Sequence, residues 1–83
     1  MTEDELLAAF TRILRDLLFN DAIVLTMETE RAQVPDWDSF NYVNFIVAIE
    51  LELGIKFNVT DVESFRTVGE IVRKARSMMS PGR

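Results

Sequence analysis

The chain has 83 residues, of which 48% are hydrophobic and 28% charged, and its formal net charge is −5. This length and composition are typical of one small globular domain. The absence of cysteine and histidine excludes disulfides, thiolate zinc sites, cysteine nucleophiles and histidine-dependent catalysis. The negative charge disfavours nucleic acid as a ligand and favours partners with basic surfaces.

The charge is unevenly distributed along the chain. Residues 64–83 hold five of the nine basic residues and one of the fourteen acidic ones, so we expect partners to dock on the acidic upstream part. The N-terminus carries acids where a secretory signal needs positive charge, and no apolar run approaches the roughly 20 residues of a membrane span. These features predict a cytoplasmic protein without a membrane span.

Apolar residues recur at intervals of three and four in the N-terminal part of the chain. The spacing predicts an amphipathic helix over about residues 3–19. Thr2 and Glu5 have the spacing of a capping box, in which the hydroxyl and the carboxylate bind free amides at the start of a helix. Asn20 and Asp21 favour its end.

Residues 20–38 mix short apolar runs with polar residues, and Val34-Pro35-Asp36 interrupts any helical continuation. The pattern predicts a long structured loop, which is uncommon in so small a domain unless the loop has a function. We expect five apolar side chains to pin it to the core. They are Val24, Leu25, Met27, Val34 and Trp37.

The stretch 39–53 is apolar at ten of its fifteen positions, and its length favours a helix over a strand. At about 100° per residue it carries two apolar stripes on opposite sides. The expected core stripe is Tyr42, Phe45, Ile46, Ile49 and Leu53. The second stripe is Phe40, Val43, Val47 and Leu51. Only one side can face the core of a small bundle, so we expect the second to bind a partner, although a second copy of the chain or the long loop could also cover it.

The remaining chain predicts a turn and two further helices. Gly54 suits the left-handed position that ends many helices, and residues 55–57 then predict an extended connection. Two pairs repeat the capping-box spacing. They are Thr60 with Glu63 and Thr67 with Glu70. These pairs predict helices over about 61–65 and 67–79, followed by a frayed tail at 80–83. The predicted fold is an all-α four-helix bundle in a single domain, 1–83, with three longer helices, a short third helix and a long loop between the first two.

Asp38-Ser39-Phe40 follows a proline-containing turn and opens the second predicted helix of an acidic chain. With this arrangement the chain resembles an acyl carrier protein, whose attachment signature is Asp-Ser followed by a large apolar residue at the head of the second helix. The likeness covers most of the chain, through residues 34–50, 54–57 and 65–72. The tripeptide alone is a weak signal, but its position among four helices of the expected lengths makes the match specific.

The resemblance implies that Ser39, preceded by Asp38, receives 4′-phosphopantetheine from coenzyme A through a phosphopantetheinyl transferase. The thiol of this arm would hold acyl groups as thioesters and present them to loading and processing enzymes, so the protein itself would be no enzyme. Free amides and the dipole at a helix N-terminus favour a phosphate there. Taken alone, Ser39 is more readily explained as a helix N-cap, by itself or together with Asp38, and only the surrounding pattern reverses that preference.

The second helix also departs from the pattern of carriers in primary fatty-acid synthesis, in which acids typically follow the serine. Two such positions hold Asn41 and Asn44, and a third holds Leu51. The expected partner-binding residues are Phe40, Val43, Asn44, Val47, Glu50 and Leu51. Fewer charges shift recognition toward apolar contact and predict a specialised polyketide, modified-lipid or aminoacyl pathway. Such a carrier is expected to work as a monomer with transient interfaces.

The number of phenylalanines in the interior indicates which size of acyl cargo the fold can hold. Five of the six are candidates for the interior: Phe10, Phe19, Phe45, Phe57 and Phe65. Rigid rings fill volume that a flexible acyl chain would otherwise occupy, which favours short or polar cargoes.

Other functions fit the sequence less well. An unmodified helical adaptor that uses the second stripe for protein binding is the main alternative, and a DNA-binding module lacks a basic face. Asp36 and Asp38 lack the further ligands of a calcium loop, so no metal site is expected.

Overall fold

The computed structural model describes residues 1–79 of the chain. Its elements are α1 (Glu3–Leu18), a short 3₁₀ helix η1 (Arg31–Gln33), α2 (Ser39–Leu53), α3 (Val59–Ser64) and α4 (Val68–Met79). No strand occurs within these residues. The prediction of an all-α bundle with three longer helices and one short third helix is therefore confirmed. The predicted tail at 80–83 lies outside the described residues.

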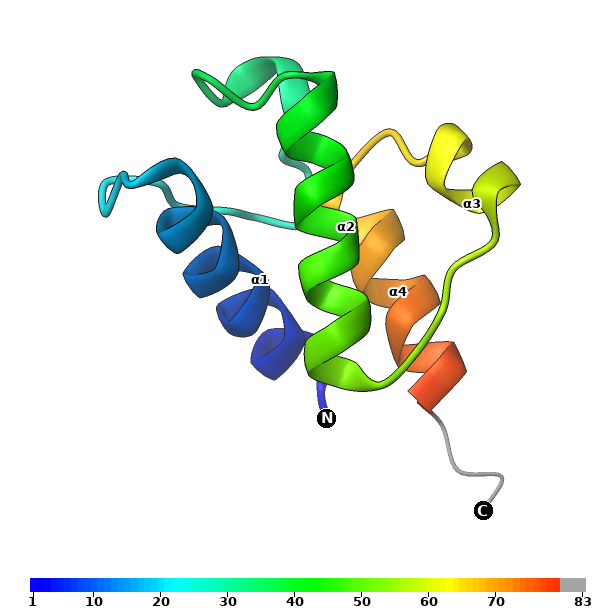
Figure 1. The fold of residues 1–83 in the computed structure, drawn as a ribbon. Coiled ribbons are helices and arrows are strands. Elements are labelled where there is room, and N and C mark those ends of the chain that lie inside the picture. Colours follow the sequence, from blue (N-terminus) through cyan, green and yellow to red (C-terminus); the bar gives the residue numbers. More distant parts are fainter. Residues whose placement is uncertain (80–83) are drawn as a thin grey trace.

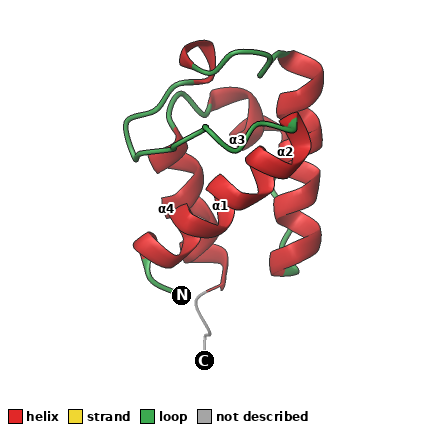
Figure 2. Cartoon of the chain, turned by 90° about the vertical axis from the view of Figure 1, so that its left-hand side faces the viewer, coloured by secondary structure: helices red, strands yellow, loops and turns green. Residues whose placement is uncertain are grey.

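Helix α2 occupies the middle of the bundle (Figure 1), with α1 on one side, α3 on the other and α4 behind it. The loop between α1 and α2 gathers at the end of the bundle where α2 begins, as Figure 2 also shows. The largest fully buried side chains form the core: Leu6, Phe10, Leu14, Phe45, Ile49, Val68 and Val72. Phe10 of α1 meets Phe45 of α2 edge to face, with ring centroids 5.8 Å apart. No helix in the described part is both long and apolar enough to cross a bilayer.

The start of α1 has the predicted capping box. The Glu5 amide donates to the Thr2 hydroxyl at 3.1 Å, and the Thr2 amide donates to the Glu5 carboxylate at 2.8 Å. This bond from the Thr2 amide lowers the pKa of Glu5, because a hydrogen bond to the charged form favours that form.

The end of α1 corrects one core prediction. Phe19 adopts the left-handed conformation, with φ 53°, and its amide donates to the Arg15 carbonyl. Its side chain is 95% exposed, so the expected interior position of Phe19 is wrong. Phe19 follows the last residue of α1, and its left-handed conformation ends the helical periodicity and turns the side chain away from the apolar stripe.

The long loop is pinned to the core as predicted at most positions. Leu25 and Trp37 are buried, and Met27 and Val34 pack against the core while half-buried. Val24 is 70% exposed, so its predicted core position is wrong. The reason is alternation: Ile23, Val24 and Leu25 have burial that switches at each residue, as in an extended chain.

The loop is also fastened to the start of α4. The Val68 amide donates to the Thr29 carbonyl at 2.9 Å, and the Gly69 amide donates to the Met27 carbonyl at 2.8 Å. A helix leaves its first amides without partners inside the helix, and here the loop supplies two of them. A Cβ at position 69 would lie 2.6 Å from the Met27 oxygen, so this close approach requires glycine.

The two later capping pairs differ from expectation. Helix α3 begins at Val59, after the N-cap Asn58, so the predicted Thr60–Glu63 box is wrong and Thr60 lies inside the helix. Within the residues that the structure describes, the Asn58 side chain makes no capping hydrogen bond; the Asn58 backbone carbonyl accepts from the Val62 amide at 3.0 Å and begins the helix. At α4 the Glu70 amide donates to the Thr67 hydroxyl at 3.3 Å, but the Glu70 carboxylate accepts from the Arg66 amide rather than from Thr67.

Candidate functional site

A tight turn precedes α2. The Trp37 amide donates to the Val34 carbonyl at 3.2 Å, and Asp36, the third turn residue, has φ 69°. Proline in the second position and a positive φ in the third are the features of a type II turn. The Asn41 side-chain amide donates to the Asp36 carbonyl at 2.9 Å and holds the turn against α2.

The turn separates the two residues that follow it. Trp37 enters the core and is 4% exposed, whereas Ser39, two residues later, is exposed at the first position of α2. The proline turn therefore presents the serine at the surface while it anchors the loop beneath.

Asp38, rather than Ser39, caps α2. Its carboxylate accepts from the Asn41 amide at 2.9 Å, and its carbonyl accepts from the Tyr42 amide at 2.8 Å. The explanation of Ser39 as the N-cap is therefore wrong, because Asp38 occupies that position. Among the described residues, the Ser39 hydroxyl has no hydrogen-bond partner that would tie it to the fold. The Ser39 hydroxyl therefore has no part in capping α2.

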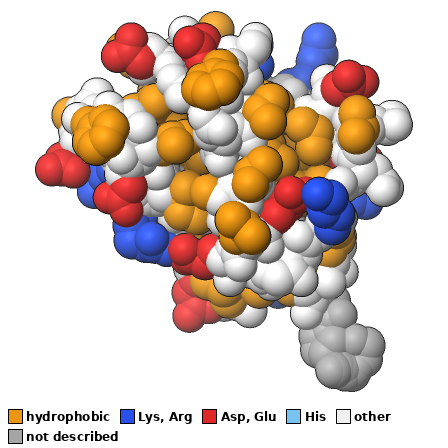
Figure 3. All heavy atoms as spheres, in the orientation of Figure 1, with side chains coloured by type: hydrophobic (Ala, Val, Ile, Leu, Met, Phe, Trp, Pro, Cys, Tyr) orange, Lys and Arg blue, Asp and Glu red, His pale blue; other side chains and the backbone are white. Residues whose placement is uncertain are grey.

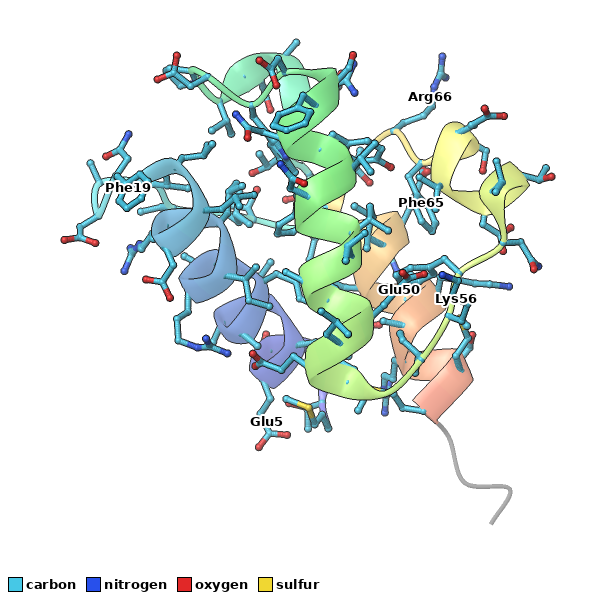
Figure 4. The ribbon with its side chains drawn as sticks, viewed as in Figure 1. Glu5, Phe19, Glu50, Lys56, Phe65 and Arg66 are labelled. Carbon is cyan, nitrogen blue, oxygen red and sulfur yellow. The ribbon has the colours of Figure 1, made fainter. Side chains whose placement is uncertain are left out.

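A groove of about 560 Å³ begins at Ser39 and runs between η1, α2 and the segment from α3 to α4. We call it the Ser39 groove. Its walls include Arg31, Ser39, Tyr42, Val62, Phe65 and Arg66. Figure 4 shows Phe65 and Arg66 on this segment, beside the start of α4. Two arginines face two glutamates, Glu30 and Glu63, around the groove, so it favours neither charge strongly.

Tyr42 forms the inner wall of the groove. Its hydroxyl donates to the Val62 carbonyl at 2.7 Å and so joins α2 to α3. The Arg31 guanidinium lies over its ring, 5.2 Å from the centroid, in a cation–π contact. Burial raises the pKa of the Tyr42 phenol, and the nearby Arg31 charge opposes this shift.

The second stripe of α2 lies at the surface. Its members are Phe40, Val43, Val47 and Leu51, which are 74%, 53%, 45% and 80% exposed. We call this set the outer face of α2, and Figure 3 shows apolar side chains along this side of the molecule. The alternative in which the long loop covers these residues is wrong, because the loop packs elsewhere.

Two polar residues expected beside this stripe have different surroundings. Asn44 is half-buried at its border. The Glu50 side chain is only 11% exposed: its carboxylate accepts from the Phe57 amide at 2.8 Å and lies 3.8 Å from the Lys56 ammonium. Figure 4 shows Glu50 and Lys56 close together, beside the connection from α2 to α3. Glu50 thus holds this connection in place.

The sequence did not indicate three residues of the groove: it gave no role to Arg31 and Arg66, and it placed Phe65 only in the interior. Arg31 lies in η1, whereas Phe65 and Arg66 lie in the segment between α3 and α4, so they meet only because these segments fold toward the start of α2. The one local signal was the pairing of Glu30 with Gln33, whose side-chain oxygen accepts from the Glu30 amide at 2.7 Å and marks η1. No pattern of spacing indicated the groove itself.

Comparison with known proteins identifies the family. The family described as "Phosphopantetheine attachment site" matches residues 37–74. No curated protein matches the chain. The solution NMR structure of a holo acyl carrier protein from Geobacter metallireducens is similar, with a TM-score of 0.82 and 33% sequence identity over 88% of this chain and 84% of that one. These matches give the protein an acyl carrier role with covalent 4′-phosphopantetheine as its prosthetic group. The chain belongs to the acyl carrier protein family.

Proposed function

We propose that Ser39 is the residue that carries 4′-phosphopantetheine. The observation that carries this proposal is the arrangement at the start of α2, where the Asp38 carboxylate caps the helix and the Ser39 hydroxyl is left exposed. Once attached, the arm supplies a thiol that holds an acyl group as a thioester. The amides and dipole at the start of α2 favour the phosphate beside them, since anions are stabilised at helix N-termini.

The residues around Ser39 fit such a group. The hydroxyl opens into a groove of about 560 Å³ with both apolar and charged walls. Arg31 and Arg66 offer guanidinium groups that can pair with phosphate or carbonyl oxygens. Val43 and Phe65 offer apolar surface for the methylene and methyl groups of an arm or cargo. The chain in this role presents cargo and leaves catalysis to its partners.

The test of Ser39 is a transfer reaction. The purified chain is incubated with coenzyme A and a broad-specificity phosphopantetheinyl transferase, and its intact mass is measured. We expect the wild type to gain one arm, Ser39→Ala to gain none, and the control Ser64→Ala, which removes another exposed serine, to gain one. A wild-type chain that stays bare would favour the unmodified adaptor, which uses the outer face of α2 only to bind proteins.

The outer face of α2 is the proposed docking surface for partner enzymes. The exposed apolar residues Phe40, Val43, Val47 and Leu51 support it, with Asn44 at its border. We assign Glu50 a structural part instead, because contact with a partner would take its carboxylate from the Phe57 amide. The partners are the transferase and the enzymes that load and process the acyl group. The carrier itself is a cytoplasmic monomer that binds them through short-lived contacts.

We further propose that the protein serves a specialised pathway rather than the general fatty-acid cycle. Neutral asparagines soon after Ser39 and the apolar outer face of α2 support contacts of low charge. The interior is filled by aromatic rings, including Phe10 against Phe45 and Phe57 against Phe65, which leaves room for short or polar cargoes rather than long chains. Ketosynthase and reductase of the general cycle should act poorly on its acyl form, and ordinary rates would contradict this proposal.

A further inference from the structure

The indole nitrogen of Trp37 stands out in the core. The side chain is 4% exposed, and its Nε1–H has no hydrogen-bond partner among the described residues. No other buried side-chain nitrogen or oxygen in this part of the chain lacks a partner. Because nearly all buried polar groups are hydrogen-bonded, such an exception calls for an explanation.

Packing explains the ring of Trp37 but not its nitrogen. The ring meets Phe45 edge to face at 5.0 Å between centroids and lies 6.2 Å from the Tyr42 ring. A phenylalanine would supply a similar aromatic surface without a donor to satisfy. An indole N–H only donates, so its missing partner must be an acceptor.

A small inner pocket lies beside this ring. It has a volume of about 20 Å³, and Trp37 is among its lining residues. Four residues line both this pocket and the Ser39 groove: Arg31, Tyr42, Phe65 and Arg66. The inner pocket therefore shares a wall with the groove, with Trp37 on the inner side of that wall and Ser39 on the outer side. Space of this size holds about one water-sized group, such as a single carbonyl oxygen, and excludes an alkyl chain.

We propose that Trp37 is a specificity-determining residue that donates its indole N–H to a carbonyl oxygen of the group attached at Ser39. This inference rests on the proposed function. The acceptor is a carbonyl, either an amide carbonyl of the arm or the carbonyl of the acyl cargo. A neutral acceptor suits a neutral donor in a groove whose arginines and glutamates balance. This hydrogen bond favours attached groups whose carbonyl oxygen can reach from Ser39 to the indole nitrogen of Trp37.

NMR of the wild-type chain tests this contact directly, since Trp37 is the sole tryptophan and gives the sole indole N–H signal. Apo, holo and acetyl-loaded forms of the ¹⁵N-labelled chain are compared, each verified by intact mass. We expect the signal to move downfield and its exchange with solvent to slow roughly two- to tenfold, as a single hydrogen bond implies. A change on arm attachment identifies an arm carbonyl, and a change only on acetylation identifies the cargo carbonyl.

The same experiment can overturn the inference. An indole signal with the same exchange rate in all three forms contradicts it, including the case in which a water molecule protects the N–H throughout. A shift without slower exchange contradicts it as well. Failure of the mass measurement to reveal an arm is a different result, because that overturns the attachment at Ser39 itself.

A variant tests the contact from the acceptor side. The arm and the acetyl group are labelled with ¹³C at their carbonyls, and their signals are compared with those of acetyl-coenzyme A. We expect one carbonyl signal to be displaced in the wild type and to return in Trp37→Phe, which keeps an aromatic ring. Phe10→Leu controls for lost stability, since it alters a buried aromatic on α1 away from the groove, and should keep the displaced signal. If Trp37→Phe does not fold, the wild-type indole signal decides; a displacement that persists in the folded variant contradicts the inference.

Discussion

The two faces of α2 are alike in composition and opposite in surroundings. On the inner face, Phe45 and Ile49 are fully buried in the core, where Phe45 packs against Phe10 of α1. On the outer face, Phe40 and Leu51 are at least 74% exposed. Apolar area buried within the fold stabilises it, whereas apolar area left in water can contribute only to an external contact. The comparison teaches that hydrophobicity along α2 serves folding on one side, whereas on the other side it stays exposed on the surface that we propose for docking.

The strongest test of this contrast substitutes one aromatic from each face. Phe45→Ala removes a ring that contacts both Phe10 and Trp37, and it should lower the free energy of unfolding by about 3–5 kcal/mol. Phe40→Ala should change it by less than about 0.5 kcal/mol, while weakening processing by partner enzymes. Urea denaturation measures the free energy of unfolding of both variants. Similar losses for the two variants would break the distinction between the faces.

The start of α2 gives a second comparison, between two adjacent residues: Asp38 caps the helix, whereas Ser39 is exposed at the surface. Asp38→Ala removes the side-chain cap and should lower the free energy of unfolding by about 1 kcal/mol. Asp38→Asn keeps an acceptor and should lose only a few tenths. Ser39→Ala should leave the free energy of unfolding within about 0.5 kcal/mol of the wild type, although we expect it to abolish arm attachment. A Ser39→Ala loss as large as that of Asp38→Ala would mean that the serine also supports the helix.

The last expected effect depends on pH and concerns Tyr42, which lies between the two faces. Burial raises the pKa of its phenol in the folded state, so the folded chain binds this proton more tightly than the unfolded chain. Its contribution is full below the ordinary tyrosine pKa of about 10 and is lost as the pH rises through the folded value. Ionisation also removes the donor to the Val62 carbonyl.

Tyr42→Phe tests this dependence, because Tyr42 is the sole tyrosine. The free energy of unfolding is measured at several pH values from 8 upward, a range chosen to bracket an ordinary phenol pKa of about 10. At the lowest pH of the range, the free energy of unfolding of the variant should be about 0.5–1.5 kcal/mol below that of the wild type, as expected for one lost hydrogen bond. The gap should then narrow as the pH rises. A gap that is constant over this range would show that the phenol stays protonated or contributes nothing.

Most of the fold could be predicted from the sequence, because local patterns determine it. Helical spacing placed α1 and α2, and Gly54, with φ 68°, ends α2 as expected. The errors lie where the chain changes direction. The sequence analysis assigned Phe19 and Val24 to the core by residue type, whereas a left-handed helix end and an extended alternation turn both outward.

The candidate site could be predicted only in part. Ser39 and Asp38 belong to one short segment, so their arrangement follows from local turn and cap chemistry. The groove depends on Arg31, Tyr42 and Phe65, which tertiary folding brings together. The buried Trp37 was predicted as an anchor, but its unpartnered nitrogen becomes apparent only when every nearby acceptor has been placed.

The cap at Asp38 has one more consequence. A helix stabilised by its own aspartate does not depend on what the neighbouring hydroxyl carries. On the proposal that Ser39 carries the arm, the chain folds before the transferase acts and keeps the cap of α2 whether the arm is empty or loaded. A carrier that keeps its fold while the attached acyl group changes can present the same surface to every enzyme that acts on it.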